Sequence, residues 1–598
     1  MCPSLIGMSV ERTFIFCLPA LLLFATALFA LSSEQPHPSY PNTDSPIGIN
    51  GIKWFHTRNS PYVWQYAERQ MARMKSAGIT WDRFDAWWSV IEPERGKFDW
   101  RFMDSIVEFY TQHGVQALPI LCYSSAWSGG TPPIEPEERA RFAEFVYRTV
   151  RRYKGRITAW EIWNEPNIPT FWKPQPSAEA YSLLLREAYS AAKTADPTCT
   201  VVGGATSMAD MNYIQDLHRF GAWNSMDVLS IHPYSMGGTA HQQRLETILD
   251  IVQEMNRATK RPKPLWITEI GWTAEGEQEE NDQAISLFQT YCLAAAKGVQ
   301  RVFWFCLEDW SEKWGIVAVD GRPKKAYTAL KLLSQAVSDA KFIGYLPDKP
   351  GPQFRGLVFR KGRKLTLAAW ANDRRVRLRV NRRAEIVNAF GAPATAQSGT
   401  VLVGRIPVLV NNFSLGRRRL IQNPPSYPNA NLLTNGDFEE ESQLPHTPNK
   451  ELDQTKGANR LKLPGWSAGR FDGSARSGIF EVRSTDRGRS AAVSQSQDAA
   501  WDSWPIPVRP GDVVVVRARV KGLKATGINA VELHFWNAVG WGWIGATRSD
   551  LLPQGNTDWR DIALTATVPG GAYMVRVDLI SRNNSGTVLF DDVELKVR

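Results

Sequence analysis

Trp160-Glu-Ile-Trp-Asn-Glu-Pro-Asn167 decides the fold, because it has the form of a buried strand that runs into a turn. The hydrophobic run from Ile157 to Trp163 suits a parallel strand that is covered on both faces. Pro166 has no N–H for a strand ladder, so we expect the strand to end just after Glu165. The pattern therefore places one carboxylate at the carboxyl end of a strand, beside an amide and among tryptophans.

A second stretch, Pro264-Leu-Trp-Ile-Thr-Glu-Ile-Gly-Trp272, has the same form and delivers Glu269. Apolar surroundings raise the pKa of a carboxyl group, which suits a general acid that works near neutral pH. Two strand-end glutamates of this kind are the equipment for cleaving a glycosidic bond. A single strand-end glutamate is more often a surface residue or a salt-bridge partner, so the hypothesis depends on the scaffold.

The scaffold predicted for residues 46–335 is a (β/α)8 TIM barrel, because strand-like apolar runs alternate there with amphipathic helical segments. In this fold the active site forms at the carboxyl ends of the strands. Glu165 would end the fourth strand and Glu269 the seventh, so we expect both on one face. The expected strands are 47–54, 80–84, 116–123, 159–163, 200–204, 227–232, 265–270 and 301–307.

The remaining chain is predicted to be β-rich, and at 598 residues the protein is too long for one core. Residues 340–422 contain short alternating strands with Gly and Pro turns, which indicates a small β-sandwich. Residues 423–430 are a Pro- and Asn-rich linker. Residues 431–598 have regularly spaced β segments with almost no helical periodicity, which predicts a β-jelly-roll.

Residues 1–33 have the form of an export signal: Arg12 precedes an uncharged apolar run from Phe14 to Leu31. The run is close to spanning length, so an uncleaved anchor that tethers the protein to a membrane is the alternative. Residues 34–45 form a Pro- and Ser-rich linker. We expect the protein to be secreted or extracytoplasmic, in the periplasm or cell envelope.

Composition favours carbohydrate handling, because the chain has 24 tryptophans and tryptophan stacks on sugar rings. A Trp-rich core is the alternative. The net charge is +10, and much of the excess lies at 374–383 and 417–419, where arginines decorate a solvent-facing strand or bind an acidic polysaccharide. The excess is diffuse, so no nucleic-acid partner is expected, and no feature indicates a protein partner. No Cys/His cluster indicates a catalytic metal, so no cofactor is expected for catalysis.

A set of motifs in the barrel segment is specific only in combination. Together they resemble the clan A retaining glycoside hydrolases, and most closely glycoside hydrolase family 39 and its relatives. The motifs are Trp163-Asn-Glu-Pro-Asn167, Thr268-Glu-Ile-Gly-Trp272, Arg83-Phe-Asp-Ala-Trp87, Ile91-Glu-Pro-Glu-Arg-Gly-Lys-Phe-Asp-Trp100, Ile231-His-Pro-Tyr234, Trp304 and Asp320-Gly-Arg-Pro-Lys-Lys-Ala-Tyr327.

The resemblance implies Glu165 as acid/base and Glu269 as nucleophile. Asn164 would then hydrogen-bond the 2-hydroxyl of the sugar, while Arg83 and Tyr234 would keep Glu269 ionised and aimed. Two carboxyl groups about 5–5.5 Å apart imply double displacement through a covalent glycosyl-enzyme, with retention of configuration.

Other side chains near the strand ends are candidates for substrate binding. His232 either orients the site or belongs to a packed turn. Trp304 is implied by the resemblance to floor the subsite that holds the cleaved sugar, whereas Trp127 and Trp172 are sugar platforms or packing residues. Glu308 either binds hydroxyls or lies in a solvated loop.

The C-terminal segment resembles jelly-roll carbohydrate-binding modules of the family 4, 9 and 22 kind, on motifs such as Asn431-Leu-Leu-Thr-Asn-Gly-Asp-Phe-Glu439 and Phe590-Asp-Asp592. The resemblance implies a structural calcium near Asp437, Glu439 and Asp592, although these residues also serve as turn formers. The candidates for sugar stacking are Trp501, Trp504, Trp536, Trp541 and Trp543.

These observations predict an exported retaining β-glycosidase that acts on a polysaccharide or oligosaccharide. Two alternatives use the same sequence features: a non-catalytic carbohydrate-binding or scaffold protein, and a transglycosidase in envelope polysaccharide synthesis. The sugar is left open, because specificity depends on loop geometry.

Overall fold

The computed structural model describes residues 45–598 apart from 235–240, 311, 348–353, 373–374, 424–430, 434, 440–461, 464, 469–476 and 539–540. The predicted leader at 1–33, and nearly all of both predicted linkers, lie outside the described residues. In the part of the chain that is described, no helix combines the length and the apolar character needed to cross a membrane.

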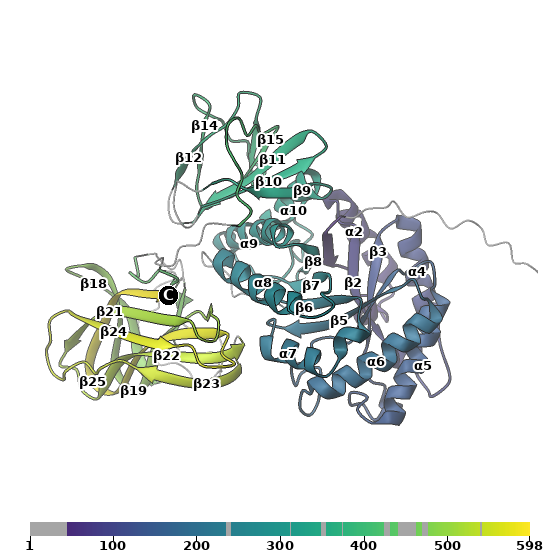
Figure 1. Cartoon of the computed structure of the whole chain (residues 1–598), viewed down its shortest axis with the longest axis horizontal. Helices are drawn as coiled ribbons and strands as arrows, with labels where there is room; N and C mark the ends of the chain where they lie inside the picture. The colour runs from purple at the N-terminus through teal and green to yellow at the C-terminus, as the bar shows by residue number, and fades with distance from the viewer. Residues whose placement is uncertain are drawn as a thin grey trace, which may run out of the picture. The chain divides into compact units, whose positions relative to one another are not determined.

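Eight parallel strands close into a barrel in sequence order, with β8 paired to β1, which confirms the predicted barrel (Figure 1). β4 is shorter than expected, because it ends at Ile162 and the Asn-Glu-Pro segment is already a turn. The strands are β1 Ile47–Asn50, β2 Trp81–Trp87, β3 Gln116–Cys122, β4 Ala159–Ile162, β5 Thr200–Ser207, β6 Val228–His232, β7 Leu265–Ile270 and β8 Val299–Phe305.

Helices follow the strands, and local signals set their ends. α5 has Glu135 as its N-cap in a capping box and Pro136 in its first turn. α4 is capped after His113 by Gly114, whose φ of 67° is left-handed. The helices are α1 Trp54–Thr57, α2 Val63–Ala77, α3 Trp88–Ile91, α4 Arg101–His113, α5 Pro136–Arg152, α6 Ala178–Ala195, α7 Met211–Arg219, α8 His241–Arg257, α9 Glu277–Ala296 and α10 Lys325–Val337.

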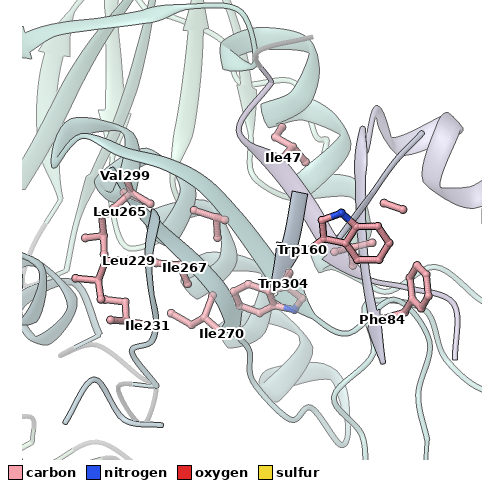
Figure 2. Close-up of a cluster of buried hydrophobic side chains, with 14 of the residues drawn as sticks. Ile47, Phe84, Trp160, Leu229, Ile231, Leu265, Ile267, Ile270, Val299 and Trp304 are labelled. Carbon is pink, nitrogen blue, oxygen red and sulfur yellow. The ribbon is translucent and has the colours of Figure 1, made fainter. Parts of the chain in front are cut away.

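The amino-terminal end of the barrel interior is filled by one buried side chain from each strand from β2 to β8. β1 contributes only Gly48, because a Cβ there would lie 2.5 Å from the ring of Phe303. The opposite faces of the strands form the main core (Figure 2). The interior is therefore packed at one end and leaves a site at the other. The inner residues are Trp81, Leu118, Ala159, Val202, Val228, Trp266 and Phe303.

The segment after the barrel forms an antiparallel sheet in the order β13-β15-β11-β10-β9 and a β12–β14 pair. The burial of β12 alternates, with Arg377 and Arg379 exposed, as expected for arginines on a solvent face. A buried salt bridge from Arg355 of β10 to Glu246 of α8 (2.8 Å) joins this segment to the barrel. The strands are β9 Lys341–Tyr345, β10 Phe354–Lys361, β11 Lys364–Ala371, β12 Val376–Arg379, β13 Glu385–Asn388, β14 Thr400–Val403 and β15 Val408–Asn411.

The C-terminal segment is antiparallel throughout its described strand pairs, and its longest strand, β25, pairs with β19, β20, β21 and β22. Trp466 and Trp501 are fully buried in its own core. The jelly-roll arrangement stays a prediction. The strands are β16 Lys462–Leu463, β17 Trp466–Ala468, β18 Ser477–Thr485, β19 Gly488–Ser503, β20 Ile506–Pro507, β21 Val513–Leu523, β22 Ile528–Ala538, β23 Trp541–Arg548, β24 Arg560–Thr567 and β25 Met574–Val597.

Candidate active site

The turn after β4 carries Asn164 and Glu165 in a strained backbone. Glu165 has a φ of 41°, in the left-handed region that non-glycine residues rarely adopt. Two contacts with the end of β5 hold the turn: the N–H of Glu165 donates to the Ala205 carbonyl (3.1 Å), and the Asn167 amide exchanges hydrogen bonds with Ser207 (2.8 and 3.0 Å). The strain therefore persists because neighbouring hydrogen bonds fix the turn.

The carboxyl group of Glu165 is buried beside a buried histidine. Its Oε1 lies 2.9 Å from Nδ1 of His232, whose Nε2 lies 3.0 Å from the Thr268 hydroxyl. Burial raises the pKa of Glu165 to about 7, with opposing effects of a hydrogen bond from Ser207 and of the Arg83 charge. Burial also lowers the pKa of His232 to about 4, so the imidazole is neutral. Glu165 can thus hold a proton near neutral pH.

Glu269 on β7 receives a donor on each of its carboxylate oxygens. Arg83 donates from Nη1 to Oε2 (2.9 Å), and the Tyr234 hydroxyl donates to Oε1 (2.5 Å). The Glu269 side chain is 15% exposed and that of Glu165 is 10% exposed, so both reach the open end of the barrel. The structure thus brings the two glutamates together with four residues that the sequence predicts at the site. These residues are Arg83, Asn164, His232 and Tyr234.

The two glutamates and His232 are close enough to act on one ligand. One carboxylate oxygen of each glutamate and a ring nitrogen of His232 lie within 4.8 Å of one another. Among the described residues this is the only group of three such side chains that could hold a metal ion. The Arg83 guanidinium beside Glu269 disfavours a cation there, since like charges repel, whereas it favours a carboxylate nucleophile.

Glu161 is a site residue that the sequence did not single out. It lies on the inner face of β4, fully buried, and its Oε2 accepts from Nε of Arg83 (2.6 Å) while its Oε1 accepts from the Ser230 hydroxyl (3.0 Å). Arg83 also donates to the amide oxygen of Asn164 (2.8 Å). The signal was present, because a charged residue in an otherwise apolar buried strand needs a partner.

Trp304 is not placed at the catalytic pair, which corrects its expected role. Its side chain has 0% exposure and belongs to the main core, because Phe303 faces the barrel interior and neighbours on a strand face opposite ways. Phe305 shares the inner face and is half-buried. The Trp314 ring lies edge-on to Phe305 and to Tyr234, at 5.8 Å each. Phe305 and Trp314 thus form an aromatic cluster with Tyr234, which contacts Glu269.

Trp172 takes a packing role, whereas the sugar-platform role of Trp127 stays a prediction. The indole N–H of Trp127 donates to the Glu92 carbonyl (2.8 Å), so it fastens one loop to another. Trp172 is fully buried, edge-on to Trp163 at 5.6 Å and to Tyr181 at 5.8 Å. Trp172 supports the turn that carries the acid from behind, rather than presenting a face to a sugar.

Glu308 is paired with side chains of α2. Its carboxylate accepts from Arg73 (2.8 Å) and Gln70 (2.5 Å). The neighbouring Asp309 is buried and paired with Lys324 (2.8 Å). Glu308 thus anchors the loop after β8 to α2, across more than two hundred residues of chain, and hydroxyl binding by its carboxylate stays a prediction.

The three carboxylates of the C-terminal segment that are predicted to bind calcium do not form a compact ligand group in the described structure. Asp592 pairs with Arg487 (2.7 Å), Glu439 accepts the N–H of Arg489 (2.7 Å), and Asp437 accepts the N–H of Glu439 (3.5 Å). Within the described part of the chain, no three metal-ligating atoms from these residues lie within 4.8 Å of one another. These hydrogen bonds fit the turn-forming role, and the calcium site stays a prediction.

The predicted stacking tryptophans of this segment differ in exposure. Trp501 is fully buried in the core, and the face of Trp504 is covered by the Arg244 guanidinium at 5.2 Å. Trp543 on β23 is 57% exposed, so its face is open to a ligand. Of these three residues, Trp543 alone retains the property that sugar stacking requires.

Two family descriptions match parts of the barrel. Residues 148–328 match the glycosyl hydrolase catalytic core, and residues 60–134 match the beta-galactosidase model named for glycosyl hydrolase family 42. The first match contains both Glu165 and Glu269.

Two curated proteins are similar over short segments. The beta-galactosidase Bga of Halorubrum lacusprofundi is 42% identical over 67 residues, 11% of this chain and 9% of that protein. A beta-xylosidase of Geobacillus stearothermophilus is 29% identical over 118 residues, 18% of this chain and 23% of that protein. The chain thus matches less than a quarter of the length of either relative.

Among solved structures, a family 39 glycoside hydrolase from Bacteroides cellulosilyticus has a TM-score of 0.49 at 23% identity, covering 57% of this chain and 77% of that one. The family 39 enzyme of Xanthomonas axonopodis pv. citri has a TM-score of 0.43 at 14% identity, covering 92% and 94%. The family matches, together with the paired carboxyl groups that they enclose, support a glycoside hydrolase.

Proposed function

We propose that the protein is an exported retaining β-glycosidase that hydrolyses a polysaccharide or oligosaccharide by double displacement. The observation that carries the proposal is the Glu165–Glu269 pair, in which one carboxylate oxygen of Glu165 lies within 4.8 Å of one carboxylate oxygen of Glu269. Retaining glycosidases keep their two carboxyl groups about 5–5.5 Å apart, whereas inverting enzymes need about 6.5–9.5 Å to admit a water molecule. The close spacing supports retention.

In the first step a carboxylate oxygen of Glu269 attacks the anomeric carbon of the sugar. Glu165 donates its proton to the departing oxygen, so the glycosidic bond breaks as the glycosyl-enzyme ester forms. The hydrogen bonds from Arg83 and Tyr234 aim the nucleophile. Arg83 also holds the amide oxygen of Asn164, which leaves the amide nitrogen to donate to the 2-hydroxyl of the sugar.

In the second step Glu165 acts as the base. Its carboxylate takes a proton from a water molecule, whose oxygen attacks the anomeric carbon and displaces Glu269. Glu165 regains the proton that it gave up, and two successive inversions retain the original configuration. A carboxyl pKa of about 7 suits both halves of the cycle.

The names of the two curated relatives, a beta-galactosidase and a beta-xylosidase, support a β-linked substrate. We further propose that the C-terminal segment is a carbohydrate-binding module with a structural calcium near Asp437, Glu439 and Asp592. The apolar run at residues 14–31 supports export, with cleavage or retention of the leader as the two outcomes.

The test is hydrolysis of aryl β-xylosides, aryl β-galactosides and a polysaccharide panel by the wild type and by Glu269→Gln. We expect the variant to lose nearly all activity, because an amide cannot form the ester intermediate. Glu94→Gln is the matched control, since Glu94 is exposed and pairs with Lys97. Proton NMR of the first-formed anomer reports retention. An inert wild type, or an unaffected Glu269→Gln, would favour a non-catalytic carbohydrate-binding protein.

A transglycosidase is the second candidate, because the same glycosyl-enzyme can pass its sugar to a hydroxyl other than water. Product analysis with and without an added oligosaccharide acceptor separates the two reactions. Longer products that appear at the expense of free sugar would replace hydrolysis as the assigned activity.

A further inference from the structure

The inner face of β2 continues beyond Arg83 with a second polar residue, Asp85. Side chains two residues apart on a strand share a face, so Asp85 points into the barrel as Arg83 does. It lies one pleat nearer the carboxyl end, about 7 Å further along the strand. Since Arg83 already contacts Glu269, Asp85 sits at the mouth of the same site.

The two oxygens of Asp85 differ in their surroundings. Oδ2 lies 3.2 Å from Nε2 of His56 and accepts the indole N–H of Trp87 at 3.3 Å. Oδ1 has only the Cys122 thiol at 3.9 Å among its hydrogen bonds to described residues, and a thiol is a weak donor. The side chain is 20% exposed, so Oδ1 can accept from a ligand.

His56 is held in a fixed position beside Asp85. Its ring lies edge-on to Trp87 at 4.8 Å and to Trp310 at 5.1 Å. Two aromatic contacts and one hydrogen bond restrict the imidazole, which in turn orients the carboxylate. This is the arrangement of a binding carboxylate with a supporting residue.

Tyr123 lies just after β3, the strand that pairs with β2. Its ring stacks on Phe171 at 5.6 Å with 14° between the planes. Burial is the main cause that raises the pKa of the Tyr123 phenol, and the charges of Asp85 and Glu269 raise it further. The phenol therefore stays neutral, so its O–H can donate a hydrogen bond to a ligand.

We propose that Asp85 binds substrate by accepting a hydrogen bond from the 3-hydroxyl of the sugar whose bond is cleaved. This rests on the proposed function, which puts the anomeric carbon at Glu269 and the 2-hydroxyl at Asn164. Asn164 contacts Arg83 (2.8 Å), so the 2-hydroxyl lies on the β2 side of the site. The next hydroxyl around the ring then meets the next inner residue of β2.

A specificity follows for the substrate class. A 3-hydroxyl that donates to Asp85 has to be free, so a sugar substituted at that oxygen does not fit. Polymers linked through the 3-position therefore place no internal unit in this subsite, whereas 4-linked chains do. His56 acts as a positioning residue through Asp85.

The test compares an aryl β-glycoside that the wild type hydrolyses with its 3-deoxy counterpart. A hydrogen bond to a charged acceptor is worth enough to lower kcat/KM of the wild type roughly 10- to 100-fold on the 3-deoxy substrate. Asp85→Ala should lose a similar factor on the parent glycoside and little on the 3-deoxy one, so that the ratio between them approaches one. His56→Ala should also reduce the ratio of kcat/KM between the parent and the 3-deoxy glycoside, but by a smaller factor than Asp85→Ala.

Asp99→Asn is the matched control, since this exposed carboxylate pairs with Arg101 and lies outside the site. If Asp85→Ala does not fold, Asp85→Leu, which has a similar shape and no acceptor, decides by the same ratio. Hydrolysis with wild-type discrimination in the Asp85 variants overturns this assignment alone. A wild type without hydrolysis overturns the proposed function, and this assignment with it.

Discussion

The proposed acid Glu165 shows how one residue acquires its chemistry from its neighbours. Burial raises its pKa to about 7, whereas burial lowers that of His232 to about 4, so a neutral ring stands against a carboxyl group that can be protonated. Both shifts have the same cause, because desolvation disfavours whichever form is charged. The pair can thus keep a transferable proton at neutral pH, because burial outweighs the opposing effect of the Arg83 charge on Glu165.

The pH dependence of kcat/KM should follow from this pKa. The protonated form of Glu165 is the acid, and it is lost as pH rises through about 7, so the rate should fall on the alkaline side from there. Glu165→Gln should remove this limb and lower kcat/KM about 10²–10⁴-fold for alkyl glycosides. Dinitrophenyl glycosides, whose leaving group needs no proton, should lose far less. Equal losses on both substrates would contradict the role.

Arg83 should not be replaceable by lysine. Its planar fork donates to Glu161, Glu269 and Asn164, and an ammonium cannot match three separated acceptors. Arg83→Lys should lower kcat more than KM changes and should lower the melting temperature, because a buried charge left poorly paired costs about 3–5 kcal/mol. Arg73→Lys, at an ion pair whose side chains are 21% and 19% exposed, is the control that should keep both values near those of the wild type.

At the scale of elements, the ends of β7 and β8 approach one another unusually closely beneath the nucleophile. A Cβ at Gly271 would lie 2.0 Å from the carbonyl oxygen of Phe305. The absence of a side chain at Gly271 lets the two strand ends come together. Because Gly271 lies two residues after Glu269, this contact holds the backbone that carries the proposed nucleophile.

Gly271→Ala should therefore destabilise the barrel. The added methyl group has to push two backbones apart, at a cost of about 1–3 kcal/mol, and should also displace Glu269. Thermal melting and kcat would both decrease. Gly545→Ala is the control, because a Cβ at that position has no neighbour within 4 Å. An unchanged melting temperature in Gly271→Ala would mean that the strand ends are not in contact.

At the scale of the whole molecule, the barrel shares its hydrophobic cluster with side chains of both β-rich segments. Trp370 of β11 and Met574 of β25 belong to the same buried cluster as the barrel helices. The Trp370 indole also donates to Gln242 of α8 (2.5 Å). The proposed catalytic barrel and the proposed sugar-binding segment thus pack against one another as parts of one continuous unit of the chain.

Trp543 provides a test of the proposed sugar-binding role of this segment. Trp543→Ala should weaken binding to insoluble β-linked polysaccharide roughly tenfold, as loss of an exposed aromatic anchor does. Hydrolysis of a soluble aryl glycoside should not change, because Trp543 lies on β23, outside the barrel. Tyr62→Ala removes a similarly exposed ring, 63% against 57%, and should leave polymer binding intact. If Trp543→Ala and Tyr62→Ala bind the polymer equally well, Trp543 has no role in binding it.

The sequence by itself determined the eight-stranded barrel and the pair Glu165 and Glu269. Both follow from local pattern: apolar runs of strand length, helical spacing between them, and a carboxylate where each run ends. The strand boundary predicted from the sequence was less accurate at β4, because the observed strand stops at Ile162, three residues before Glu165. The strained turn there is held by contacts with β5, which lies forty residues away.

Only the tertiary structure decided which face each strand residue takes and which distant groups meet. Trp304 and Phe305 are adjacent and both aromatic, yet alternation sends one into the core and the other to the site. Glu161 and Glu308 depend on partners, Arg83 and Arg73, that are close only after folding. Local periodicity specifies that faces alternate, but burial of the whole barrel selects which face is inside, and long-range pairing gives each charge its role.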